Sequence, residues 1–347
     1  MIRRFLICFF SYLLIFGSLA GAFSWYFYQS YLDTPLDLDE RAFILRVPEN
    51  SSLTSVTREL GIDGYLLYPR LLLFHAKLQK TQSIQVGEYE LVGGDSPRIL
   101  LEKLHGGDVL LYRTSLIEGW STRQMLDHLR SDARLNDDIG EVAIEDLPSW
   151  LNLDIGFAEG WFYPDTYLYA RDLPISVLLL QAHERMQDIL AEEWLQRDFG
   201  VPYETPYQAL IMASIVEKET GVTEERSQIA GVFVRRLKQG MRLQTDPTVI
   251  YGLGEAFSGN LTRAHLRQAN PYNTYLIKGL TPTPIANPGR DAIRAALNPD
   301  QGSALYFVAR GDGSHQFSDT LEAHNAAVRQ FQIEQRAVNY QSAPDGE

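Results

Sequence analysis

The sequence predicts an α+β protein with a single N-terminal transmembrane helix, a small βααβ subdomain and a larger mixed α+β domain. Three observations lead to this fold class: an uncharged apolar run over residues 5–28, a strand–helix–helix–strand pattern over residues 43–108, and a mixture of strands and long helices over residues 109–340. The chain has 347 residues, of which 45% are hydrophobic, so it can bury the cores of two domains.

The apolar run of residues 5–28 is long enough to cross a bilayer, since as a helix it would measure about 36 Å. Arg3 and Arg4 precede the run, so the positive-inside rule places residues 1–4 in the cytoplasm and the rest of the chain outside. The outer end of the run carries the aromatic residues typical of a membrane interface, Trp25, Tyr26 and Tyr28.

A cleaved signal peptide is the alternative interpretation of this run, because Ala20-Gly21-Ala22 resembles a cleavage site. The run continues to Tyr28, well beyond that site, which favours an uncleaved anchor. The only cysteine, Cys8, lies inside the run, so the rest of the chain can form no disulfide. The formal charge of -13 argues against nucleic acid as a partner, since its phosphates would be repelled.

Residues 29–42 form a polar segment that we expect to be a stalk between the membrane and the first subdomain. The subdomain, residues 43–108, is expected to contain strands at 43–47 and 87–91 and helices at 51–60, 68–78 and 96–105. Its strand–helix–helix–strand order resembles the LysM glycan-binding module. This small pattern is not specific, so a plain packing subdomain is an equal alternative.

The larger domain is expected to cover residues 109–340. We expect strands at 111–117 and 305–309, helices at 122–129, 175–194, 205–221, 225–238 and 321–338, and an irregular region rich in Gly, Asn and Pro from 239 to 290. Long irregular segments in a compact domain are usually functional. The tail, residues 341–347, is expected to be disordered.

The helix at 205–221 places a carboxyl group in an apolar stripe. Thr205 suits its N-cap and Gly221 its C-terminal stop. Glu219 shares one face of this helix with three apolar residues, Met212, Ile215 and Val216. Glu217 points to the other side of the helix.

A carboxyl group among apolar side chains has a raised pKa and can donate a proton near neutral pH. That is the property which cleavage of a glycosidic bond requires of its general acid. The alternative is an amphipathic surface helix whose two glutamates reach solvent or pair with Lys218 and Arg226.

Ring-bearing and amide side chains are concentrated in the segments on both sides of this helix. Candidates for stacking on sugars are Trp161, Tyr251, Tyr272 and Tyr275, and candidates for bonding hydroxyl or acetamido groups are Gln244, Asn273 and Asn287. Core packing is the alternative for each aromatic residue. There is no HExxH pair, G-x-S-x-G elbow or Walker A motif, so we expect no metal ion and no cofactor.

Five motifs resemble those of the endolytic murein transglycosylases, the YceG-like family: EGWFYPDTY, ASIVEKET, MRLQTDPTVIYG, NPYNTY and GLTPTPIANPG. The resemblance covers nearly the whole chain and implies a single-pass inner-membrane enzyme with a periplasmic LysM-like subdomain and catalytic domain. Such enzymes cleave peptidoglycan strands internally, between N-acetylmuramic acid and N-acetylglucosamine, and leave a 1,6-anhydro-muramyl end. The resemblance also implies association with penicillin-binding proteins. This chain has Thr281 and Thr283 where the family pattern has Pro and Gly.

The resemblance assigns the catalytic role to Glu219, with Glu217 as the alternative acid and otherwise a contact to the substrate. It implies that Gln244, Thr245 and Asp246 position the sugar or stabilise developing charge. It further implies that three residues line the groove, Tyr272, Asn273 and Tyr275. Asp246 could instead cap a turn before Pro247.

Two other functions remain open from the sequence. The first is a muramidase-type hydrolase, in which Glu219 would work with Glu217, Glu224 or Asp246. Glu217 and Glu219 lie about 160° apart on the helix, which argues against that pair. The second is a non-catalytic scaffold that binds the cell wall.

Overall fold

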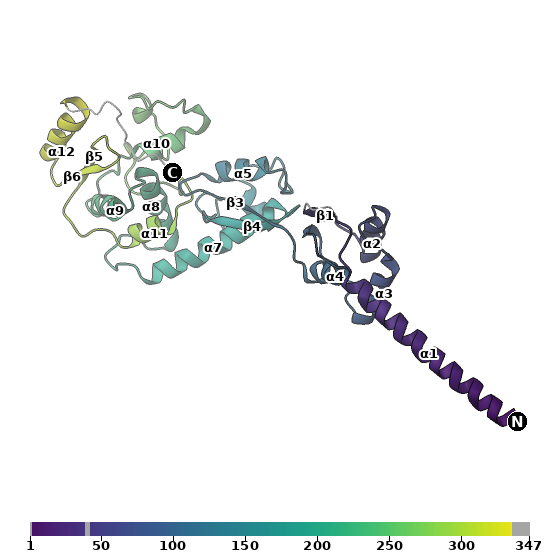
Figure 1. Cartoon of the computed structure of the whole chain (residues 1–347). Coiled ribbons are helices and arrows are strands. Elements are labelled where there is room, and N and C mark those ends of the chain that lie inside the picture. The colour runs from purple at the N-terminus through teal and green to yellow at the C-terminus, as the bar shows by residue number, and fades with distance from the viewer. Residues whose placement is uncertain (1, 39–41, 335–347) are drawn as a thin grey trace. The chain divides into compact units, whose positions relative to one another are not determined.

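The N-terminal apolar run forms one long helix, α1 (Ile2–Asp33), in the computed structural model of this protein, which describes residues 2–38 and 42–334 (Figure 1). Its segment Phe9–Asp33 is long and apolar enough to cross a membrane. Large apolar side chains along this helix are exposed, including Phe16, Leu19 and Phe23. The length and composition of α1 therefore fit a membrane anchor, and its orientation stays a prediction.

The smaller of two compact units comprises Met1–Tyr112 with Leu168–Asp172. In it, β1 (Phe43–Val47) pairs antiparallel with β2 (Gly87–Leu91), with Phe43 opposite Leu91. The unit also contains α2 (Leu53–Ile62), α3 (Pro69–Gln79) and α4 (Pro97–Gly106). Ser52 and Ser96 accept hydrogen bonds at the starts of α2 and α4, where they act as N-caps. The βααβ order is thus present, while the likeness to LysM stays a prediction.

The last turn of α1 belongs to the core of the smaller unit. Tyr31 and Leu32 are buried there together with Leu36. The backbone N–H of Leu36 donates to the carbonyl of Asp95 at 2.7 Å. The structure therefore differs from the expected stalk over residues 29–42, because its described part, 29–38, completes a helix and then packs on the unit. Residues 39–41 lie outside the described residues.

Strands β3 (Leu111–Ser115) and β4 (Thr166–Ala170) form a separate two-stranded sheet. The larger unit comprises Arg113–Tyr167 with Leu173–Glu347. Its helices are α5 (Thr122–Ser131), α6 (Leu147–Trp150), α7 (Ile175–Leu195), α8 (Pro206–Glu219), α9 (Thr223–Lys238), α10 (Asp246–Leu253), α11 (Arg290–Leu297) and α12 (Leu321–Val328). Its remaining strands, β5 (Tyr306–Ala309) and β6 (His315–Ser318), form an antiparallel hairpin.

Short helical turns complete the larger unit, at Gly254–Ala256, His265–Arg267 and, in π-helical form, Arg329–Glu334. The region 239–290, expected to be irregular, contains α10 and two of these turns. The expected last helix, 321–338, is α-helical only to Val328, and its end and the tail 341–347 lie outside the described residues.

Helix α8 is the central element of the larger unit and packs against α7, α9 and α11. Thr205 caps its start by accepting a hydrogen bond from the N–H of Gln208 at 3.3 Å. Every residue from Ala209 to Val216 is buried. The helix ends at Glu219, where the extended Thr220 leaves it, and Gly221 does not take the positive φ of a left-handed stop. The core therefore fixes this helix up to its last turn.

Replacing Leu32 by Ala should lower the free energy of unfolding of the smaller unit by about 2–5 kcal/mol, because it leaves a cavity in the core. Denaturant unfolding of the full chain in detergent would measure this change. Ser30→Ala, at an exposed position of the same helix, is the matched control. Equal stability of the two variants would mean that the end of α1 is a free stalk.

Candidate active site

Glu219 lines a cleft of about 840 Å³ in the larger unit. The walls come from the end of α8, the segment before α10, Tyr275, the β5–β6 hairpin and α12. Of the residues proposed from the sequence, the cleft brings together Glu219, Gln244, Thr245, Asp246 and Tyr275. Segments far apart in the chain thus meet around one carboxyl group.

Burial raises the pKa of Glu219 to about 7. The negative charge of Asp246 adds to this rise, whereas the hydroxyl of Thr245, which donates to Glu219 Oε1, and the charge of Arg236 oppose it. Glu219 is also the last residue of α8, where the partial negative charge of the helix end disfavours a carboxylate. A substantial fraction of Glu219 is therefore protonated at neutral pH.

The segment that carries Thr245 is held from two sides. The carbonyl oxygen of Thr274 accepts a hydrogen bond from the N–H of Gln244 at 3.2 Å, and its hydroxyl accepts one from the N–H of Thr245 at 3.1 Å. The buried guanidinium of Arg236 donates to the carbonyl oxygens of Leu243 and Leu305, each at 2.7 Å. Gln244 has a φ of 55°, an uncommon conformation that these contacts keep in place. The Thr245 hydroxyl is thereby fixed beside Glu219.

Asp246 and Tyr275 form a second polar pair in the cleft. The Tyr275 hydroxyl donates to Asp246 Oδ1 at 2.6 Å. Burial and this contact raise the pKa of Tyr275, so it stays a neutral donor. Asp246 is the first residue of α10 rather than its N-cap, and Thr245 occupies the cap position. The Asp246 carboxylate is thus available at the cleft.

Glu217 has a different environment from Glu219 and does not line the cleft. Its Oε1 lies 3.1 Å from Arg226 Nη2, and its Oε2 accepts from the N–H of Gly289 at 2.9 Å. The side chains of Glu217 and Arg226 are only 5% and 9% exposed. Glu217 therefore ties α8 to α9 and to the start of α11, and it is not placed to contact a ligand in the cleft.

Asn273 is fully buried and shapes the loop that presents Tyr275. Its Nδ2 donates to the carbonyl of Gln268 at 2.8 Å, and its Oδ1 accepts from the N–H of Tyr275 at 3.0 Å. Tyr272 shares a hydrogen bond of 2.8 Å between its hydroxyl and that of Thr283. Neither residue lines the cleft, so the structure does not bring this part of the expected groove to Glu219.

Tyr251 and Asn287 also lie outside the cleft, where both contact the buried carboxyl group of Glu159. The Tyr251 hydroxyl donates to Glu159 Oε2 at 3.1 Å, and Asn287 Nδ2 donates to Oε1 at 3.3 Å. Burial raises the pKa of Glu159 to about 7. No local sequence pattern indicates this network, because its members come from segments distant in the chain.

The first residues of the EGWFYPDTY motif pack closely on the loop with the sequence GLTPTPIANPG. Gly160 has a φ of 85°, and an added Cβ would come within 2.5 Å of Pro284. Trp161 stacks on Tyr207, with ring centroids 5.8 Å apart, and is not in the cleft. These two motifs therefore support the fold around α8.

Other residues that line the cleft were not predicted from the sequence, among them Lys218, Arg236, Tyr306, His315 and His324. His315 Nδ1 lies 2.7 Å from Glu225 Oε2, which fixes the β5–β6 hairpin on α9. A strand was expected at 305–309, but no local pattern indicated that the hairpin would form a wall of the cleft. Within residues 2–38 and 42–334, no group of three or more His, Cys, Asp or Glu side chains is placed to hold a metal ion.

The sequence profile of the YceG-like family matches residues 45–330. The chain belongs to this family. The match spans both units and includes every residue that lines the cleft up to Val328. The resemblance seen in the five motifs is thereby confirmed.

Relatives with a named activity belong to the endolytic murein transglycosylases. The protein of that name from Bacillus subtilis is 28% identical over 332 residues, which cover 90% of this chain and 91% of the relative. The protein of that name from Streptococcus pneumoniae is 27% identical, and the match covers 91% of this chain but 63% of that longer relative. A crystal structure of a YceG-like protein from Listeria monocytogenes matches 83% of this chain and 99% of its own, with 27% identity and a TM-score of 0.50.

Replacing Glu217 by Ala should destabilise the larger unit by about 3 kcal/mol, because it leaves the Arg226 guanidinium buried without its nearest partner. Denaturant unfolding would measure this loss. Glu184→Ala, at an exposed position on α7, should stay within about 0.5 kcal/mol of the parent chain. An unchanged stability for the Glu217 variant would contradict its role as an anchor of α8.

Proposed function

We propose that this protein is an endolytic murein transglycosylase that cleaves peptidoglycan strands internally, between N-acetylmuramic acid and N-acetylglucosamine. The observation that carries the proposal is Glu219, a carboxyl group with a pKa of about 7 at the wall of an 840 Å³ cleft. The named activity of the relatives from Bacillus subtilis and Streptococcus pneumoniae supports the same reaction.

In the first step, protonated Glu219 donates its proton to the glycosidic oxygen. The bond between that oxygen and C1 of the muramyl residue breaks, positive charge develops at C1 and the ring oxygen, and N-acetylglucosamine leaves with a hydroxyl group. The raised pKa of Glu219 suits this step, because the acid form is populated near neutral pH.

In the second step, the Glu219 carboxylate takes the proton from the muramyl C6 hydroxyl as that oxygen forms a bond to C1. The product is a 1,6-anhydro-muramyl end, and Glu219 returns to its acid form. The nucleophile belongs to the substrate and acts at high effective concentration, so neither a water molecule nor a carboxylate nucleophile is needed. One residue serves as both acid and base.

The polar groups beside Glu219 fit supporting roles in this reaction. The Thr245 hydroxyl donates to Glu219 and favours its ionised form after the first step. The Asp246 carboxylate is placed to offset positive charge developing on the sugar, and Tyr275 holds it in position at 2.6 Å. Gln244 supplies an amide at the cleft for hydroxyl or acetamido groups.

Hydrolysis is the alternative chemistry for this cleft. It would use Asp246 as the second carboxylate, since Glu217 is engaged with Arg226 and Gly289. The ends of the product strands distinguish the reactions, because hydrolysis leaves reducing ends and transglycosylation leaves anhydro ends.

We further propose that α1 anchors the enzyme in the inner membrane, with the larger unit and the βααβ part of the smaller unit in the periplasm. The βααβ part would act there as a LysM-like contact to glycan. An anchored enzyme would meet newly made strands close to the membrane. Its cuts would then terminate glycan polymerisation, beside the penicillin-binding proteins that make the strands.

Replacing Glu219 by Gln should lower the rate of strand cleavage by about 10²–10⁴-fold, because the general acid and base is lost. Mass spectrometry of purified peptidoglycan strands would measure new anhydro ends. Glu184→Gln, exposed on α7, is the matched control and should cleave like the parent chain. Reducing ends would make the protein a hydrolase, and full activity of the Glu219 variant would assign catalysis to another residue.

The rate of strand cleavage should fall as the pH rises above about 7, because Glu219 then loses the proton that it must donate. Replacing Thr245 by Val removes a hydrogen bond that favours the ionised form of Glu219, so the pKa of Glu219 should rise. The decrease in rate should then occur at higher pH. A profile of kcat/KM against pH would measure the shift, with Thr54→Val on α2 as control. A shift to lower pH would contradict the role of the Thr245 hydroxyl.

A further inference from the structure

Helix α3 and the turn before it expose a stripe of large apolar side chains. Leu67, Phe74 and Leu78 are 60%, 54% and 59% exposed. Phe74 and Leu78, four residues apart, share one face of α3, and Leu67 lies in the turn before the helix. Tyr68, beside Leu67, is also 60% exposed. A contiguous exposed apolar surface of this kind marks a contact with a partner or a membrane.

The stripe is attached to the part of α1 that would leave the membrane. Phe27 of α1 packs on Tyr68 with ring centroids 6.1 Å apart, and Tyr28 packs on Phe74 at 6.3 Å. Phe27 and Tyr28 lie in the aromatic end of the apolar run, where a membrane helix meets the headgroup region. Since the next turn of α1 is buried in the smaller unit, no flexible linker separates α3 from the membrane end of α1.

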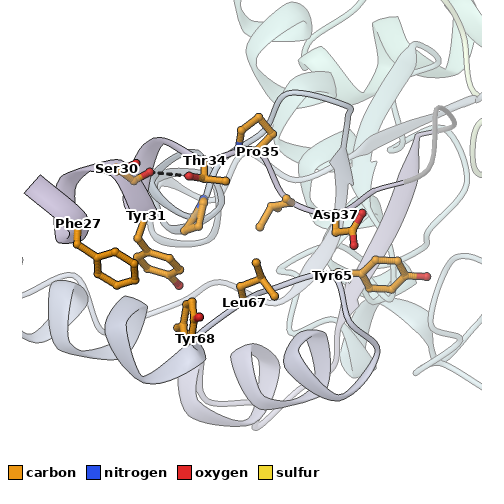
Figure 2. A pocket seen from close by; sticks show the side chains of 11 residues that line it. Phe27, Ser30, Tyr31, Thr34, Pro35, Asp37, Tyr65, Leu67 and Tyr68 are labelled. Carbon is orange, nitrogen blue, oxygen red and sulfur yellow. Dashed lines mark hydrogen bonds between the residues drawn. The ribbon is translucent and has the colours of Figure 1, made fainter.

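An apolar pocket adjoins the stripe on the other side of Tyr68. It has a volume of about 130 Å³, and Figure 2 shows Phe27 and Tyr31 of α1 facing Leu67 and Tyr68 across it. The junction of α1 with the smaller unit thus presents apolar surface in two adjoining places. This surface continues the lipid-facing surface of α1.

Basic side chains border the stripe. Arg70 and Lys77 are exposed on α3, Lys80 is exposed at its end, and the helix contains no acidic residue. The chain as a whole has a net charge of -13, so this local basic character is a departure from its average. An apolar face bordered by Lys and Arg is the pattern of a helix that lies in the surface of an anionic bilayer.

We propose that α3 is an interfacial helix that binds the surface of the bilayer which α1 enters. Leu67, Phe74 and Leu78 insert among the acyl chains near the headgroups, and Arg70 and Lys77 contact phosphate groups of anionic phospholipids. The inference rests on the proposed anchoring by α1. It adds a second contact with lipid that fixes the orientation of the smaller unit on the membrane.

Nitroxide labelling of the full chain in phosphatidylglycerol-containing nanodiscs would test the proposal. Single cysteines would replace Phe74 or Leu78 in a Cys8→Ser background, with Leu14→Cys in α1 as the lipid reference and Glu49→Cys, exposed after β1, as the water reference. Collision rates with oxygen, which concentrates in lipid, and with a polar nickel complex report the depth of each label. All labelled side chains are exposed, so the substitutions spare the cores of the units.

The expected result is a ratio of oxygen to nickel collisions at residues 74 and 78 several-fold above that at residue 49 and approaching that at residue 14. Lipid exposure at residue 14 with water exposure at residue 74 would overturn the inference and leave the anchoring intact. Water exposure at residue 14 would instead overturn the anchoring. Labels at 74 and 78 shielded from both reagents would also overturn the inference, because the face would then be covered by protein, such as a second copy of this chain.

Discussion

The buried contact of Glu217 with Arg226 and with the backbone of Gly289 is the interaction on which the cleft depends. It ties the end of α8 to α9 and to the start of α11. Breaking it would leave the buried Arg226 guanidinium with only the more distant carboxyl groups of Glu118 and Asp291, at 3.6 and 3.7 Å. Because this contact fixes the last turn of α8, the side chain two residues later is held at the wall of the cleft.

Two glutamates on one helix therefore have opposite properties. Glu217 contacts the Arg226 guanidinium and the backbone N–H of Gly289. Burial raises the pKa of Glu219 to about 7, the charge of Asp246 adds to the rise, and the Thr245 hydroxyl and the charge of Arg236 oppose it. The difference comes from what each face of α8 meets, since the residue type is the same. The raised pKa of Glu219 suits a residue that acts as both acid and base in the cleft.

Helix α1 joins a candidate membrane span to the core of the smaller unit. Its final turn contributes Tyr31 and Leu32 to the core of the smaller unit, so the helix that fits a membrane span is also a structural element of that unit. In the proposed anchoring, helix geometry would set the distance between the unit and the lipid. The basic, apolar face of α3 lies beside this junction.

The sequence alone determined the features that depend on neighbouring residues. An uncharged run specified α1, the strand–helix–helix–strand pattern of residues 43–108 indicated the βααβ order, and helical periodicity separated Glu219 from Glu217 on α8. These properties can be read locally, because a helix or strand that buries one face needs apolar residues that recur with its own period.

The tertiary structure decided which polar residues reach Glu219. Tyr275 lines the cleft, whereas the side chain of Asn273, two residues earlier, forms hydrogen bonds within its own loop. Arg236 and His315 join the cleft through contacts with segments far away in the chain. Composition and spacing do not encode such pairings, because they follow from how the helices and the β5–β6 hairpin pack once their apolar faces are buried.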